Sequence, residues 1–211
     1  CAGGMVSVVC SNALSKVVQE MGILSTNEIL NKTRELVVLN LGKSNKQMRD
    51  GMDISLCAFN QKTRELSWSG ANNPLLVIEN GKSIEFSPDK QPVGWTEQNI
   101  PFTQHTIPIN QNTMLYLFTD GYADQFGLSE DARKHANEIL TNNASSNEEK
   151  KFAKAVLAKG KKFKYAQLKT LLCEISDKEM SAQKEVLVQQ FNAWKGPLEQ
   201  VDDVCVIGIK L

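Results

Sequence analysis

The sequence contains few histidines, few aromatic residues and no excess of either charge. Its 211 residues include two histidines and 7% aromatic residues, and 24 lysines and arginines balance 24 aspartates and glutamates. Proteins that bind nucleic acid or anionic membranes through charge carry a basic excess, so the zero net charge argues against both kinds of partner. A zinc site is disfavoured because there are only two histidines and no CxxC pair.

Long apolar runs are also absent. No run approaches the ~18 residues needed to cross a bilayer, and no signal peptide is recognisable. The five cysteines are odd in number, and Cys10, Cys57 and Cys205 lie within apolar runs, where small buried thiols are common. These features favour reduced thiols and predict a cytoplasmic domain without direct membrane contact, while the parent protein could be membrane-attached through regions outside this sequence.

Apolar spacing predicts helices first and strands afterwards. Residues 5–21 and 25–39 carry apolar side chains at helical spacing. From Met52 the period becomes two, with Met52, Ile54, Leu56 and Ala58 on one face and Asp53, Ser55 and Cys57 on the other. Further strands are predicted at 65–70, 75–78, 83–86, 102–109 and 113–119, with a hairpin signal at Asn80-Gly81. The residues alone therefore predict an antiparallel meander of five or six strands.

The second half of the chain is mostly helical. Residues 128–160 contain two polar helices, from Ser129 to about Leu140 and from Glu148 to Ala158, and are interpreted as a helical insert. Helices follow at 166–175 and 179–194, and a last strand is predicted from Val201 to Lys210. The basic cluster at 160–164 is either a solvated charged face or a patch that attracts phosphate, and the first reading is the commoner one.

Two strand ends carry aspartates. Asp120-Gly121 ends an apolar strand, where glycine tolerates positive φ and the dipeptide favours a turn. Asp202-Asp203 stands at the start of the last predicted strand. Either could be an ordinary turn or a solvated strand start. Taken together they predict a site for Mg²⁺ or Mn²⁺, because buried acidic groups are costly without a cation and these ions prefer oxygen ligands.

Five segments resemble the stage II sporulation protein E type of phosphatase domain, the bacterial branch of the metal-dependent PPM serine/threonine phosphatases. The segments occur in family order and cover nearly the whole chain outside the insert. They are Gly51-Met52-Asp53-Ile54-Ser55-Leu56-Cys57, Gly70-Ala71-Asn72-Asn73-Pro74-Leu75-Leu76, Gln91-Pro92-Val93-Gly94, the segment from Phe118 to Gly127, and the segment from Gln200 to Gly208.

The resemblance implies an α+β fold, an antiparallel β-sandwich flanked by helices, forming a single domain over residues 1–211. It also implies a two-metal centre, holding Mn²⁺ or Mg²⁺, whose bridging water attacks phosphorus directly. Asp120 and Asp202 then correspond to the catalytic metal aspartates. Gly121 lets the backbone turn tightly beside the metals, and Asp203, assigned to the same metal set, is the weaker ligand candidate. The substrate-binding residues are unknown.

The sequence departs from the family in two places. The family's Asp-x-x-Gly-His-Gly loop, which supplies a bridging aspartate, has no counterpart before Gly3-Gly4-Met5-Val6-Ser7, so we expect an N-terminally incomplete domain whose metal site holds roughly half its ligands. Residues 128–160 are the second departure. We expect this insert to lie beside the active-site mouth and to select substrates.

Three functions stay open at this point. The first is a hydrolase acting in bacterial signal transduction on the phosphoserine or phosphothreonine of a regulatory protein. The second is a catalytically inactive phosphatase-fold module that serves as a scaffold or sensor output. A metal-dependent nuclease is disfavoured by the neutral charge and the lack of a basic stripe with stacking aromatics. A homodimer through the 5–21 helix is also open.

Overall fold

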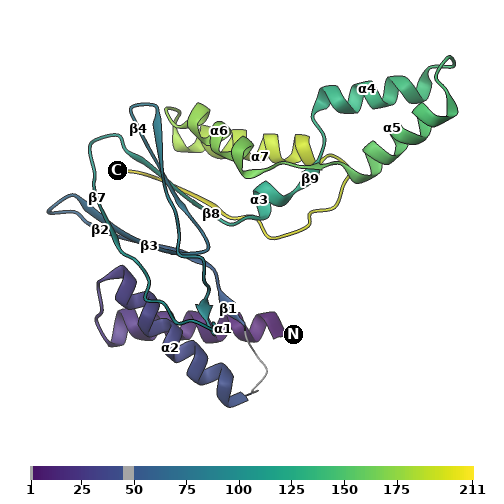
Figure 1. The fold of residues 1–211 in the computed structure, drawn as a ribbon. Helices are drawn as coiled ribbons and strands as arrows, with labels where there is room; N and C mark the ends of the chain where they lie inside the picture. The colour runs from purple at the N-terminus through teal and green to yellow at the C-terminus, as the bar shows by residue number, and fades with distance from the viewer. Residues whose placement is uncertain (1, 45–49) are drawn as a thin grey trace. The chain divides into compact units, whose positions relative to one another are not determined.

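The computed structural model of the chain describes residues 2–44 and 50–211, with helices and antiparallel sheets (Figure 1). Cys1, which precedes the Gly3-Gly4 segment from which an N-terminally incomplete domain is expected, lies outside the described residues. The described chain forms two compact units. The first runs to Phe118 and includes Ile209–Leu211, and the second spans Thr119–Gly208. The single-domain organisation of residues 1–211 stays a prediction.

The first unit begins with a pair of helices. Helix α1 (Ala2–Ser15) continues into a short π-helix, η1 (Lys16–Glu20), and helix α2 spans Thr26–Ser44. Gly22 adopts a φ of +66° in the connection, as the predicted helix stop requires. Helix α2 extends beyond the predicted end at Leu39. Its Val37 and Leu41 are buried against Val6, Cys10 and Ala13 of α1, so tertiary packing supports the extra turn.

The first sheet has three strands in the order β2-β3-β7, and both neighbouring pairs are antiparallel. Its strands are β2 (Ile54–Asn60), β3 (Glu65–Ala71) and β7 (His105–Pro108). A second sheet has the order β11-β8-β4-β5, with β4 (Leu75–Glu79), β5 (Lys82–Phe86), β8 (Met114–Phe118) and β11 (Val206–Lys210). Short strands β1 (Gly51–Met52) and β6 (Val93–Gly94) form a separate pair.

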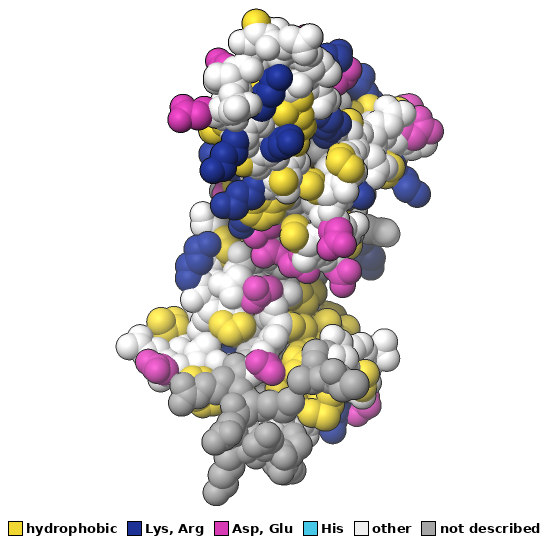
Figure 2. Space-filling view, turned by 90° about the vertical axis from the view of Figure 1, so that its right-hand side faces the viewer, with side chains coloured by type: hydrophobic (Ala, Val, Ile, Leu, Met, Phe, Trp, Pro, Cys, Tyr) yellow, Lys and Arg dark blue, Asp and Glu magenta, His cyan; other side chains and the backbone are white. Residues whose placement is uncertain are grey.

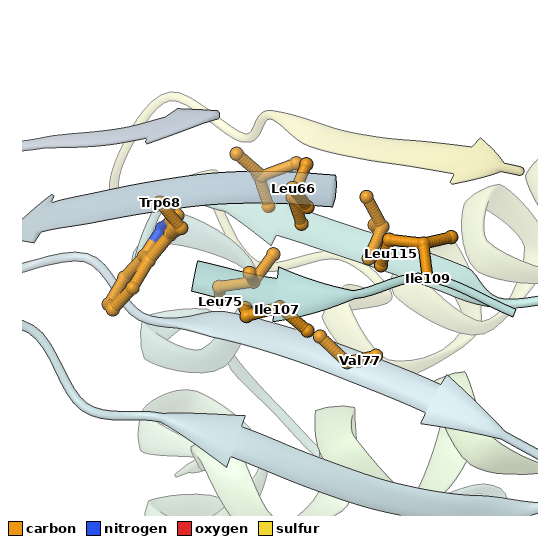
Figure 3. Close-up of a cluster of buried hydrophobic side chains, with 8 residues drawn as sticks. Leu66, Trp68, Leu75, Val77, Ile107, Ile109 and Leu115 are labelled. Carbon is orange, nitrogen blue, oxygen red and sulfur yellow. The ribbon is translucent and has the colours of Figure 1, made fainter. Parts of the chain in front are cut away.

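The predicted simple meander is wrong, whereas the α+β fold with antiparallel sheets is confirmed. Strand β3 pairs with β7, and β4 pairs with β8, so the chain changes sheets between Ala71 and Leu75. The reason is burial. Figure 3 shows Leu66, Trp68 and Ile107 of the first sheet clustered with side chains of the second, and only two facing sheets enclose such a core.

Strand β2 alternates between two faces, as the period of two predicted, but both faces carry apolar side chains that pack. Cys57 and Phe59 pack against the core between the sheets. Met52, Ile54 and Leu56 pack on the opposite side, against a buried cluster that includes Leu30 of α2. The first sheet therefore lies between the inter-sheet core and the helices. The expected burial of small thiols is right for Cys10, which is buried, and wrong for Cys205, which is exposed.

The second unit holds the helices that the sequence predicted after residue 128. In chain order its elements are α3 (Gly121–Asp124), β9 (Phe126–Gly127), α4 (Glu130–Thr141), α5 (Asn147–Lys159), β10 (Lys161–Lys162), α6 (Tyr165–Ile175) and α7 (Met180–Lys195). Ser129 caps α4, and a complete capping box formed by Ser146 and Glu149 begins α5. That residues 128–160 are an insert stays a prediction.

The last strand is shorter than predicted. It begins at Val206, and residues 201–205 are not in a strand. Side chains take backbone groups along this segment. The buried Gln125 amide donates to the Glu199 carbonyl (2.9 Å) and accepts from the Val201 N–H (3.3 Å), and the Thr119 hydroxyl accepts from the Cys205 N–H (3.1 Å). Those backbone groups therefore bond to a side chain instead of a neighbouring strand.

A final property concerns membranes. No helix within residues 2–44 and 50–211 combines the length and apolar composition that a membrane span needs.

Candidate metal centre

Asp120 stands at the junction between the strand end and helix α3. It occupies the position before Gly121, with helical backbone angles (φ −72°, ψ −18°), and its carbonyl accepts a hydrogen bond from the Asp124 N–H at 2.9 Å. Its side chain makes no capping bond and is exposed. The expected cost of a buried carboxylate is therefore wrong for Asp120, because the strand ends before the acidic residue and leaves it in water.

Thr119 links this junction to the segment that holds the second pair of aspartates. The Thr119 N–H donates to the Cys205 carbonyl (3.0 Å), and the Cys205 N–H donates to the Thr119 hydroxyl (3.1 Å). The same hydroxyl donates to the Asp203 carbonyl (3.2 Å). These three bonds fix residues 203–205 beside Thr119 and so place both predicted acidic segments in one region of the second unit.

Gly121 is required here for space. It is buried, and a Cβ built on it would contact the Asp203 carbonyl oxygen and lie 3.5 Å from the Asp202 carbonyl carbon. Gly121 does not belong to the residues with positive φ, so the conformational reason expected from the Asp-Gly dipeptide is wrong. Glycine is needed at position 121 because two backbone segments approach each other closely there. The four predicted site residues, Asp120, Gly121, Asp202 and Asp203, thus come from two segments in direct contact.

The carboxylates at this contact face solvent. Asp120, Asp202 and Asp203 are all exposed, and the ion pairs found in the described parts of the chain involve none of them. One Asp202 carboxylate oxygen accepts from the Asp203 N–H at 2.7 Å, and the Gln200 amide donates to the Asp202 carbonyl at 2.8 Å. The loop is therefore ordered by its own bonds, which leaves carboxylate oxygens available for a ligand.

The donor chemistry fits a hard divalent cation. Mg²⁺ binds proteins through one or two carboxylates and keeps several waters, and oxygen ligands also suit Mn²⁺. No group of three or more His, Cys, Asp or Glu side chains within residues 2–44 and 50–211 is arranged to hold a metal. Among the described residues, the carboxylates of Asp120, Asp202 and Asp203 therefore supply oxygen donors of the type these cations prefer, without a cluster of three metal-binding side chains.

Asp124 and the basic cluster that follows α5 are joined by an ion pair. The Lys162 ammonium lies 2.8 Å from an Asp124 carboxylate oxygen, with both side chains about half exposed. Strand β10, which contains Lys162, pairs with β9 directly after α3. Asp124 therefore ties α3 to the strand that follows α5.

Sequence reasoning missed two residues that build this centre. Thr119 and Gln125 lie inside the segment from Phe118 to Gly127 that carried the resemblance, yet neither has a side chain that suggests a metal ligand. Their role is to bond the backbone of residues 199–205. Their position within a motif was the available signal, but their partners lie more than 70 residues away in the chain.

Comparison with protein families finds one matching model. The model of stage II sporulation protein E (SpoIIE) matches residues 2–167. A search of curated proteins found no match.

Solved structures show the same fold at low sequence identity. The SiaA-PP2C domain of Pseudomonas aeruginosa aligns with a TM-score of 0.76 and 17% identity, covering 100% of this chain and 70% of that one. PppA, a key regulatory component of T6SS in Pseudomonas aeruginosa, aligns at 0.55 and 14%, covering 98% and 80%. The Mn-presoaked phosphatase domain of the cell fate determinant SpoIIE from Bacillus subtilis aligns at 0.50 and 10%, covering 95% and 70%.

Proposed function

Because this chain belongs to the stage II sporulation protein E (SpoIIE) family, we propose that it is a metal-dependent serine/threonine phosphatase that acts on a phosphorylated regulatory protein. The fold it shares with PP2C phosphatase domains supports a hydrolase of this class. The Mn-presoaked relative supports the choice of Mn²⁺ or Mg²⁺ as the cation.

One observation carries the proposal. The backbone around Gly121 touches that of Asp202 and Asp203, and Thr119 bonds both Asp203 and Cys205, so two acidic segments separated by about 80 residues meet. A divalent cation bound by carboxylates of both segments would offset the repulsion between these negative charges. A site for a hard cation explains why the fold joins these segments.

Asp120 and Asp202 are the proposed metal ligands, and Gly121 and Asp203 hold their segments together. A bound divalent cation lowers the pKa of water and offsets the charge that develops on phosphoryl oxygens. Asp203 contributes mainly through its backbone, since its carbonyl accepts from Thr119 and its N–H donates to Asp202. This arrangement keeps the Asp202 side chain in position while the loop remains open to solvent.

The alternative function is an inactive phosphatase-fold module that binds a partner. The observation that favours it is that the described residues hold no group of three or more metal-binding side chains. The exposure of Asp120 and Asp202 is also compatible with an inactive module, because exposed aspartates cost little to retain.

Hydrolysis of p-nitrophenyl phosphate with added Mn²⁺ separates the two functions. We expect Asp120→Asn and Asp202→Asn each to reduce the Mn²⁺-dependent rate by about 100-fold, because a lost ligand weakens the cation and its electrostatic effect. Asp177→Asn is the matched control, since Asp177 is an exposed aspartate in the turn after α6. Its rate should equal that of the wild type.

Metal binding gives a second measurement on the same proteins. Titration of Mn²⁺ followed by electron paramagnetic resonance should show weaker binding in both site variants and unchanged binding in Asp177→Asn. Equal rates and equal Mn²⁺ binding in all four proteins would favour the inactive module.

A further inference from the structure

Helix α5 carries an exposed aromatic side chain among lysines. Phe152 is 70% exposed, although phenylalanine is usually buried, and Lys151 and Lys154 on the same helix are exposed. Lys159 at the end of the helix and Lys161 in β10 are exposed as well. We call these five residues the basic strip. Figure 2 shows lysine and arginine side chains around exposed hydrophobic ones on the upper part of the face drawn there.

Acidic neighbours do not neutralise the basic strip. The ion pairs found in the described part of the chain include none of its four lysines. Glu149 lies on the same helix, but its carboxylate accepts from the backbone N–H and hydroxyl of Ser146 at 2.7 and 2.9 Å. The capping box thus engages Glu149, and Glu148, three residues before Lys151, forms none of the ion pairs found in the described residues, so the lysine charges stay available to another molecule.

Packing against α4 explains why this face stays open. Helices α4 and α5 contact each other, and each buries an alanine, Ala136 of α4 at 4% exposed and Ala153 of α5 at 1% exposed. Phe152 lies outside that contact, and burying it there would require space that the small residues do not leave. Its exposure is therefore built into the helix pair.

The basic strip leads toward the candidate metal centre within the second unit. Lys162, next to Lys161, bonds Asp124, and the Asp124 N–H bonds the Asp120 carbonyl. From Phe152 to Lys159 the helix rises about 10 Å, and the extended residues up to 162 add about 10 Å. An extended peptide covers the resulting ~20 Å in about six residues.

We propose that the basic strip docks an acidic segment of the phosphoprotein substrate, about six or more residues away from the phosphorylated residue. This inference rests on the proposed phosphatase function and adds the part of the substrate that the enzyme reads. Lysines pair with carboxylates of the segment, and Phe152 covers an apolar side chain at its end. A membrane is a poorer fit, because an interfacial helix needs a broad apolar face and α5 uses its other side to pack on α4.

The test measures binding separately from catalysis. A fluorescein-labelled phosphoserine peptide, with four aspartates starting six residues from the phosphoserine and a leucine after them, is titrated with the full chain and followed by fluorescence anisotropy. The comparison peptide has asparagine in place of each aspartate. We expect wild-type protein to bind the aspartate peptide about tenfold more tightly than the asparagine peptide at low salt.

Variants assign that preference to the basic strip. Lys151→Glu combined with Lys154→Glu should remove the tenfold preference, and Phe152→Ser should weaken binding of both peptides. Lys178→Glu combined with Lys184→Glu reverses two exposed lysines elsewhere in the second unit and should leave the preference unchanged. The rate of p-nitrophenyl phosphate hydrolysis should be the same in all of these proteins, because an ester this small does not extend from the candidate metal centre to the basic strip.

Several results would overturn the inference. One is an equal loss of preference in both double variants, and another is a preference that survives Lys151→Glu with Lys154→Glu. A third is strip-dependent binding to vesicles of anionic phospholipid in place of the peptide, and a fourth is strip-dependent self-association. A wild-type protein that shows the peptide preference but hydrolyses no ester would instead refute the phosphatase and leave the docking site standing.

Discussion

Replacing Gly121 by alanine tests the contact that joins the two acidic segments. The added Cβ would contact the Asp203 carbonyl oxygen and lie 2.9 Å from its carbonyl carbon, whereas ordinary contacts begin at 3.4 Å. Both atoms belong to the backbone and cannot rotate away, so the Asp203 segment must retreat by about 0.5 Å or more. That movement stretches the hydrogen bond from the Thr119 hydroxyl to the Asp203 carbonyl, which is already 3.2 Å long.

The expected magnitude combines three effects. Overpacking costs about 1–3 kcal/mol, and weakening one hydrogen bond costs about 1 kcal/mol. Alanine is more favourable than glycine at a helical position by up to about 1 kcal/mol, which offsets part of these costs. The net loss is about 2 kcal/mol, which corresponds to a melting temperature lower by roughly 4–8 °C for a chain of this size.

Thermal unfolding followed by circular dichroism measures the loss, and Gly4→Ala is the matched control. Gly4 lies in helix α1, and a Cβ added to it would have nothing within 4 Å. Its alanine variant should be unchanged or more stable by up to about 1 kcal/mol. Mn²⁺-dependent hydrolysis should fall in Gly121→Ala and persist in Gly4→Ala. If Gly121→Ala has the melting temperature and the activity of the wild type, the close backbone approach is refuted.

Three further predictions concern stability. Ser146→Ala should cost about 1 kcal/mol and speed hydrogen exchange in the first turn of α5, because it removes the capping box; unchanged exchange would contradict this. Arg133→Ala should cost about 2 kcal/mol in urea unfolding, since one guanidinium nitrogen donates to the carbonyls of Leu128, Ala193 and Trp194, with Arg133→Lys recovering only part. Burial raises the pKa of the Cys57 thiol from 9.0 to about 12, so its contribution to stability is complete below pH 9 and is lost as the pH rises to 12. Cys57→Ala should flatten the fall in unfolding free energy over that range, and parallel pH curves would count against the assignment.

The sequence alone determined the features that depend on neighbouring residues. Asn80 and Gly81 both adopt positive φ, at 51° and 73°, because that turn demands residues that tolerate the left-handed region. Helices α4 to α7 lie within a residue or two of their predicted bounds for the same reason, since caps and apolar spacing are local. The four candidate site residues could also be named, because two strand ends carry aspartates, while the roles proposed for them came from the resemblance to a family.

Only the tertiary structure decided features that depend on distant partners. The change of sheet between Ala71 and Leu75 follows from which strands share a core, and no local pattern encodes that. Residues 201–205 read as a strand, yet the Gln125 side chain takes their neighbouring backbone groups, and the carboxylates that looked buried are exposed. The local reason for glycine at position 121, a positive φ, proved wrong. The reason in the structure is distant, because the Asp203 backbone leaves no space for a Cβ. Short-range steric effects can be predicted from neighbouring residues in the sequence, whereas hydrogen-bond partners and burial are set by segments that meet only when the chain folds.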